Sequence, residues 1–195
     1  MYEFDDGKLV PFTEELITEK YLSWFNNLTI CEHTSHCIYP MTRDRAIEYI
    51  KNVNRPGSDT IVWAILICTH YQGKDRVYSH VGNVCLTSIN LINRTAEIGI
   101  VIGENVRNKG IGTKVLNIVM QHGFNRLNLQ RLWLGTSSLN IGMQKAALKA
   151  GMKLEGSLKN ALFTNGKYVD DQIYGIIKYR YERYMDQNRE KREHE

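Results

Sequence analysis

Residues 95–127 read TAEIGIVIGENVRNKGIGTKVLNIVMQHGFNRL and decide the fold. Residues 95–102 form an apolar, β-branched run, which predicts a strand. From Lys109 to Leu127 the apolar side chains recur at helical spacing, and residues 131–137 predict the next strand. A strand, a helix and a second strand in this order predict two parallel strands joined by a right-handed crossover.

Patterns on both sides of this crossover predict further strands and helices. Five more strands are predicted, at residues 9–12, 60–69, 78–93, 154–163 and 168–178. Three more helices are predicted, at residues 18–27, 42–53 and 141–150, and residues 71–76 are predicted to form a polar loop. Short connections favour antiparallel pairing of neighbouring strands. We therefore expect an α+β domain with a central mixed, mostly antiparallel sheet flanked by helices.

The composition is that of one globular domain. The chain has 195 residues, of which 43% are hydrophobic and 24% are charged, so a packed core is available. Residues 186–195 are almost wholly charged or polar, and we expect a domain at 1–185 followed by a disordered tail.

Several classes of protein are disfavoured by the same sequence. No stretch reaches the roughly 18–20 apolar residues of a membrane helix, and the acidic N-terminus MYEFDDGKLVPF does not resemble a secretory signal. The net charge of +4 is mild and forms no basic stripe, so neither a nucleic acid nor a membrane is an expected partner. Four cysteines are too few for a disulfide scaffold, which favours a cytoplasmic location.

The loop before the central helix carries the first chemical signal. Gly110 and Gly112 allow the backbone to turn sharply and to approach a ligand closely. The unpaired N–H groups of the helix start, with Arg107 and Lys109 beside them, suit a pyrophosphate. The loop matches neither the P-loop pattern nor the dinucleotide fingerprint, and an ordinary capped helix start is the alternative interpretation.

A cluster of cysteine and histidine is the second signal. Cys31, His33, His36 and Cys37 supply four metal-type ligands within seven residues. Structural zinc sites split their ligands into two pairs across a longer loop, so we expect no metal here. A polar loop beside a substrate pocket is the preferred interpretation.

An ordered set of motifs resembles the GNAT acetyltransferase superfamily. Residues 107–112, RNKGIG, resemble its Arg/Gln-x-x-Gly-x-Gly/Ala signature, and residues 94–99, RTAEIG, resemble the segment that leads into its fourth strand. One branch of the superfamily has a stretch similar to residues 148–156, LKAGMKLEG, and a closing hairpin similar to residues 165–171, NGKYVDD. This branch includes acetyltransferases of ribosomal proteins, polyamines and amino sugars. The resemblance is strong from Glu97 to Asp171.

The resemblance implies that acetyl-CoA is the acetyl donor. It implies that the backbone from Asn108 to Thr113 holds the pyrophosphate, and that Asn140 contacts the cofactor; its alternative role is to cap the next helix. The strand end would pair with the pantetheine arm. The implied cofactor-binding residues are Ile100, Val101, Ile102, Arg107, Asn108, Lys109, Gly110, Ile111, Gly112, Thr113 and Asn140.

Direct transfer to an amine needs a base, and Glu97 is the candidate because a carboxylate can take the proton of an ammonium group. A surface carboxylate is the alternative interpretation. The resemblance also implies a general acid, but Ala147 and Met143 stand where relatives have a tyrosine or a serine. Tyr174 is the remaining candidate, and a core tyrosine of a strand is its alternative.

The acceptor side is predicted from aromatic and neutral polar residues of the first helices and the last hairpin. These residues are Trp24, His33, His36, Tyr39 and Tyr168. They favour a small-molecule amine acceptor, first an amino sugar linked to a nucleotide, because rings and hydroxyl groups suit stacking and hydrogen bonds. A protein N-terminus, a polyamine and a non-catalytic acyl-CoA sensor are the alternatives, and a homodimer is one option for the assembly.

Overall fold

The computed structural model describes residues 1–27, 30, 38–107 and 109–193. Across these residues, eight strands form one sheet in the order β1-β2-β3-β4-β5-β6-β8-β7. The strands are β1 (Tyr2–Phe4), β2 (Gly7–Pro11), β3 (Ile61–Gln72), β4 (Asp75–Asn90), β5 (Thr95–Ile102), β6 (Arg131–Ser137), β7 (Lys153–Thr164) and β8 (Lys167–Ile177). The pair β5–β6 is parallel and the other pairs are antiparallel, so the predicted mixed sheet and its crossover are confirmed.

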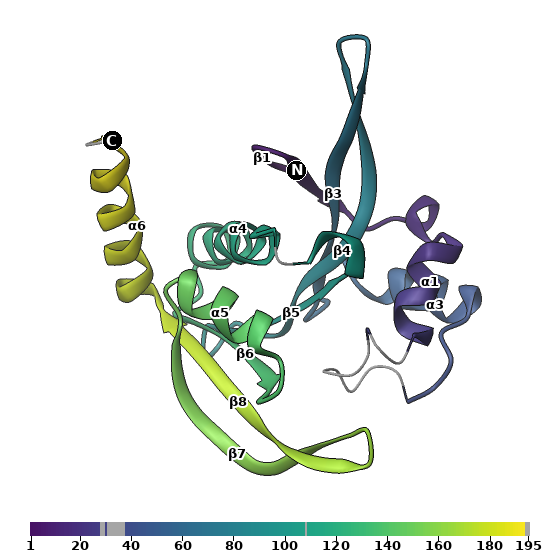
Figure 1. The fold of residues 1–195 in the computed structure, drawn as a ribbon. Coiled ribbons are helices and arrows are strands. Elements are labelled where there is room, and N and C mark those ends of the chain that lie inside the picture. Colours follow the sequence, from purple (N-terminus) through teal and green to yellow (C-terminus); the bar gives the residue numbers. More distant parts are fainter. Residues whose placement is uncertain (28–29, 31–37, 108, 194–195) are drawn as a thin grey trace.

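Helices cover both faces of this sheet (Figure 1). The helices are α1 (Glu19–Asn26), α3 (Arg43–Asn52), α4 (Ile111–Asn125), α5 (Ile141–Lys149) and α6 (Lys178–Glu193), with short 3-10 turns at Glu14–Leu16 and Glu104–Val106. One core lies between the sheet and α4, α5 and α6, and a second lies between the sheet and α1 and α3. We call these two faces the α4 side and the α1 side.

Local signals explain where the helices begin. The hydroxyl of Thr18 accepts a hydrogen bond from the N–H of Tyr21 at 3.2 Å, and Thr42 accepts one from Arg45 at 3.3 Å. Both threonines are the first residues of the predicted helix ranges, and threonine is favoured as a helix cap. Gly151 follows α5 with a φ of +85°, the left-handed conformation that glycine favours after a helix.

Three expectations need correction. The predicted loop at 71–76 is a tight turn at Gly73, because β3 and β4 continue as a long hairpin arm through Gln72 and Asp75. Strand β1 was not predicted; its three residues pair with β2. The tail expected to be disordered is helical through Glu193, as part of α6, which starts on the core with Tyr181.

No helix in the described ranges combines the length and the apolar character needed to cross a membrane. The cluster of cysteine and histidine that was considered as a metal site lies outside these ranges, because residues 31–37 are not described. His33, His36 and Asn108 are therefore named as candidates but not placed.

Candidate active site

Strands β5 and β6 pair along only part of their length. Their pairing runs from Thr95 with Arg131 to Glu97 with Trp133, although β5 continues to Ile102 and β6 to Ser137. Beyond Glu97 the two strands diverge. The edge of β5 that faces this opening can therefore pair with an extended ligand, as a neighbouring strand would.

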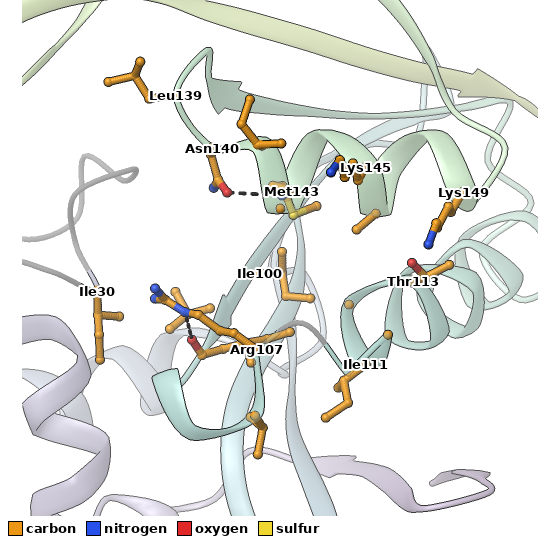
Figure 2. Close-up of a pocket in the computed structure, with 18 residues that line it drawn as sticks. Ile30, Ile100, Arg107, Ile111, Thr113, Leu139, Asn140, Met143, Lys145 and Lys149 are labelled. Atoms are coloured by element: carbon orange, nitrogen blue, oxygen red, sulfur yellow. Dashed lines mark hydrogen bonds between the residues drawn. The ribbon is translucent and has the colours of Figure 1, made fainter.

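A groove of about 510 Å³ lies along the end of β5 on the α4 side (Figure 2). Its floor is the end of β5, one wall is the start of α4, and the other wall is α5. The described residues that line it are Ile30, Ile100, Val101, Ile102, Val106, Arg107, Gly110, Ile111, Gly112, Thr113, Leu139, Asn140, Ile141, Gly142, Met143, Lys145, Ala146 and Lys149.

The start of α4 gives this groove an anion-binding end. Gly110 precedes the helix with a φ of +75°, and the N–H of Lys114 makes the first helical bond, to the carbonyl of Gly110 at 3.2 Å. The N–H groups of Ile111, Gly112 and Thr113 come before this bond and so have no partner within the helix. The positive end of the helix dipole adds to their attraction for an anion.

Three cationic side chains border the groove. Arg107 crosses its mouth, and its Nε donates to the carbonyl of Ile102 at 3.2 Å. Lys145 and Lys149 lie one turn apart on α5 and both line the groove, and in Figure 2 Lys149 extends towards Thr113 of α4. These cations suit a ligand that carries several phosphates.

Asn140 lies where it can both cap α5 and contact a ligand in the groove, the two roles considered from the sequence. It caps α5, where its side-chain oxygen accepts from the N–H of Met143 at 3.1 Å, and it also lines the groove. The cap uses the oxygen, which leaves the amide NH₂ as the part that can donate to a ligand.

Glu97 lies where β5 and β6 separate. It is half-buried, and its side chain points to the α1 side of the sheet, the side opposite the groove. Burial raises the pKa of its carboxyl, and the negative charge of Asp171 raises that pKa further. Both causes move the carboxyl towards the range in which it can accept and release a proton near neutral pH.

A sequence profile described as the acetyltransferase (GNAT) domain matches residues 8–153. The chain belongs to the GNAT acetyltransferase family. The groove and the diverging strands described above lie within, or directly beside, the matched residues.

Curated relatives in this family act on different amines, by their names. The chain is 33% identical over 100 residues to the spermidine N(1)-acetyltransferase of Escherichia coli (strain K12), which covers 51% of this chain and 54% of that protein. It is 32% identical over 97 residues to the ribosomal-protein-serine acetyltransferase of the same strain, covering 50% and 54%. The matched part of the chain thus spans about half the length of these relatives.

Solved structures of GNAT proteins share the fold over most of the chain. A spermidine N-acetyltransferase from Vibrio cholerae, in complex with CoA and spermine, has a TM-score of 0.77 at 22% identity and covers 90% of this chain and 98% of its own. A ribosomal L7/L12 alpha-N-protein acetyltransferase in complex with coenzyme A has a TM-score of 0.73 at 19% identity, covering 89% and 95%. The GNAT fold expected from the sequence is confirmed.

Several residues predicted for the GNAT site lie away from the groove. Tyr174 is 3% exposed in the core on the α4 side, and its hydroxyl donates to Gln172 at 2.9 Å. This is the core position considered as its alternative, so we do not assign it to the chemistry. Lys109 is exposed before the helix but does not line the groove.

The aromatic acceptor residues do not form one surface. Trp24 is 3% exposed and packs edge-on against Tyr21 and His80; part of it borders a smaller cavity of about 180 Å³ next to the groove. Tyr39 is exposed and lies under Arg45, and Tyr168 is exposed at the hairpin tip against Phe163. An indole packed edge-on in the core has no free face for stacking on a sugar ring.

Sequence reasoning missed the contribution of α5. Lys145, Lys149 and Ala146 line the groove, and Met143 lies beside them. The signal was available in principle, because residues four apart on a helix share a face and Ile141, Lys145 and Lys149 are so spaced. The sequence did not show that this face turns towards α4.

Proposed function

We propose that this chain is an acetyl-CoA-dependent N-acetyltransferase that moves an acetyl group directly to a primary amine. The observation that carries the proposal is the continuity of one groove. It runs from the uncapped start of α4 to the free edge of β5, next to the point where β5 and β6 separate. Family membership supports the same activity.

The residues of the groove fit the donor. The N–H groups of Ile111, Gly112 and Thr113 would hold the pyrophosphate, and Lys145 and Lys149 would neutralise phosphate charge. The free edge of β5 would pair with the amide groups of the pantetheine arm. When bound, acetyl-CoA supplies an activated acyl group as a thioester.

Gly112 fits this assignment for a steric reason. A Cβ at this position would lie 3.6 Å from the Cβ of Ala146, in the space between α4 and α5. The absence of a side chain keeps this part of the groove open, so that a phosphate can approach the backbone closely.

Glu97 is the proposed base. An amine acceptor is an ammonium ion near neutral pH, and its nitrogen cannot attack until it loses a proton. The raised pKa of Glu97 suits this transfer, directly or through a water molecule. Met143 borders the groove where relatives have a serine, and a thioether cannot donate a proton, so we assign protonation of the leaving thiolate to solvent.

We propose a cationic amine, either a polyamine or a protein N-terminus, as the acceptor, ahead of an amino sugar. The carboxyl groups of Glu97 and Asp171 are close enough for the charge of Asp171 to act on Glu97, and negative charge at this place favours a cationic acceptor. Trp24 is packed into the core, which removes the main stacking surface expected for a sugar. The names of the relatives, for spermidine and for ribosomal proteins, support the same order.

The test is the release of free thiol from acetyl-CoA against spermidine, a short peptide with a free N-terminus and a nucleotide-linked amino sugar. We expect spermidine or the peptide to be acetylated at least about tenfold more efficiently than the sugar, which is about 1.4 kcal/mol of discrimination. Glu97→Gln is the matched variant, because it keeps the size of the side chain. It should lower kcat by about 10²- to 10⁴-fold with CoA affinity unchanged.

Two results would contradict the proposal. If the amino sugar is the only compound acetylated, the proposed cationic acceptor is wrong, and the proposed acetyltransferase activity stands. If CoA stabilises the protein against heat but no amine in the panel is acetylated, the chain is a CoA-binding domain rather than an enzyme.

A further inference from the structure

Strand register places a second carboxylate on the same face of the sheet as Glu97. Glu97 pairs with Trp133 of β6, and Ser137 of β6 pairs with Asp171 of β8. Paired residues, and alternate residues along one strand, point to the same face of a sheet. Glu97, Trp133, Gly135 and Asp171 therefore share the α1 side of the sheet.

The Asp171 carboxylate leans along β6 towards Glu97. A Cβ built on Gly135 would lie 3.1 Å from Oδ2 and 3.2 Å from Oδ1 of Asp171, so the glycine provides the room that the carboxylate occupies. Gly135 stands between Ser137, the direct partner of Asp171, and Trp133, the partner of Glu97. This orientation of the Asp171 side chain brings its carboxylate closer to Glu97 than the strand register alone would.

Asp171 is poorly compensated in this position. Within the described part of the chain, its Oδ1 is buried without a hydrogen-bond partner. Burial raises the pKa of its carboxyl, although the backbone N–H of Thr136 acts in the opposite direction. A buried acceptor oxygen without a donor is costly and needs an explanation.

Two other titratable groups on this side of the sheet are uncharged. Cys85, from β4, is close enough for the charge of Glu97 to act on it, and burial raises the pKa of its thiol to about 11. Burial also raises the pKa of Tyr49 on α3, which lies near Cys85. Because the pKa of the Cys85 thiol and the pKa of the Tyr49 phenol both lie above their ordinary values, both groups are neutral between about pH 5 and 9.

An ion pair also lies on this face of the sheet. Arg131, two residues before Trp133, forms a bidentate pair with Glu155, with Nη1 donating to Oε1 at 2.9 Å and Nη2 donating to Oε2. This pair has no net charge. Among the groups just named, Asp171 is the one whose charge acts on Glu97 without compensation.

We propose that Asp171 is a positioning residue for the transfer: it acts through Glu97, keeping a second negative charge beside the base so that Glu97 accepts a proton from the acceptor near neutral pH. The inference rests on the proposed function. The N–H bond of the ammonium group breaks and the proton passes to a Glu97 oxygen. The lone pair stays on nitrogen to bond the acetyl carbon, and the electrons of the C–S bond leave with sulfur.

A nearby negative charge disfavours the ionised form of a carboxyl, so removing the charge of Asp171 should make Glu97 easier to ionise. Asp171→Asn keeps the shape and removes the charge. It should shift the acidic limb of the pH profile of kcat/KM for spermidine to lower pH, because one of the two causes of the raised Glu97 pKa is removed. Asp171→Ser, a smaller uncharged variant, should give the same direction of shift.

Asp170→Asn is the matched control, because it makes the same substitution one residue away. The Asp170 carboxylate pairs with Lys159 at 2.6 Å and accepts from the N–H of Asn160 at 3.1 Å. As the neighbour of Asp171 in a strand, it points to the opposite face of β8. This control should leave the acidic limb where it is in the wild type.

A second readout does not depend on turnover. The carboxyl ¹³C signal of Glu97, followed by NMR in the protein without substrates, should titrate at lower pH in Asp171→Asn than in the wild type. An unmoved Glu97 titration and an unmoved acidic limb overturn the inference, even if kcat falls. If the wild type acetylates no amine, the proposed function fails, and the NMR titration still decides the role of Asp171.

Discussion

The conformation of Gly110 allows a direct test of the anion-binding end of the groove. Gly110 has a φ of +75°, and a Cβ added there would meet no heavy atom of the described residues within 4 Å. Gly110→Ala therefore introduces backbone strain without a steric clash. The new residue can keep the left-handed conformation at a cost, or it can relax and reorient the N–H groups that follow.

The size of the effect follows from the dihedral angle. A left-handed conformation costs a non-glycine residue about 1–2 kcal/mol. For a chain of this length, 1 kcal/mol corresponds to a change in Tm of about 2–4 °C, so we expect a decrease of about 2–8 °C. If the strain is relieved by tilting the N–H groups, the same energy is lost from donor binding, which weakens CoA affinity by about 5- to 30-fold.

Gly57 supplies the matched control for this experiment. It has a φ of +81°, its added Cβ also meets nothing within 4 Å, and it is exposed in the turn after α3. Gly57→Ala should lower Tm by a similar amount and leave CoA affinity unchanged. The assay is calorimetric titration with CoA and a thermal melt for both variants. Equal CoA affinity in Gly110→Ala and the wild type would show that the phosphate is not held at the start of α4.

Three further predictions concern charge and the C-terminus. Lys145→Ala with Lys149→Ala should weaken CoA binding several-fold and reduce its dependence on salt, because exposed charges are screened over roughly 8–10 Å near physiological ionic strength; an unchanged salt dependence would contradict it. Removing all residues after Met185 should change Tm by less than about 4 °C, since the exposed end of α6 contributes less than about 1 kcal/mol; a larger decrease would show that it docks. Arg131 lowers the pKa of Glu155, so the stabilisation by this ion pair is present at neutral pH and is lost as pH falls through that lowered pKa; Glu155→Gln should cost less than about 1 kcal/mol at pH 7, measured by urea unfolding, and a cost that stays the same as pH falls through the lowered pKa would contradict this.

The elements that the sequence predicts well are those set by local signals. Strand β5 and strand β6 have the predicted bounds, because each is a short apolar run between turn residues. Helices α1 and α3 begin after capping threonines. The loop at Gly110 is also local, since its glycine conformation and the helix that follows depend on a few adjacent residues.

The features that the sequence predicts poorly depend on distant contacts. The separation of β5 and β6 after Glu97 is a property of the pairing of two strands, and neither strand carries a signal for it. Trp24 was expected beside a substrate because it is aromatic, but its contacts with Tyr21 and His80 place it in the core. The final helix was missed because its polar residues gave no periodic pattern, while Tyr181 and Tyr184 anchor its first turns.

In the proposed assignment the diverging strands give the site two sides, so that the donor and the base would not compete for space. The groove for an extended phosphate-bearing ligand lies on the α4 side, with its cations on α5 and at Arg107. The carboxyl of Glu97 lies on the α1 side, at the point where the opening begins. Cations that attract the donor would lower the pKa of a base placed among them, and a carboxylate beside the phosphates would repel the donor. Placing the two on opposite faces of one sheet avoids both conflicts, and the gap between β5 and β6 is where a reactive end held on one side can reach an amine on the other.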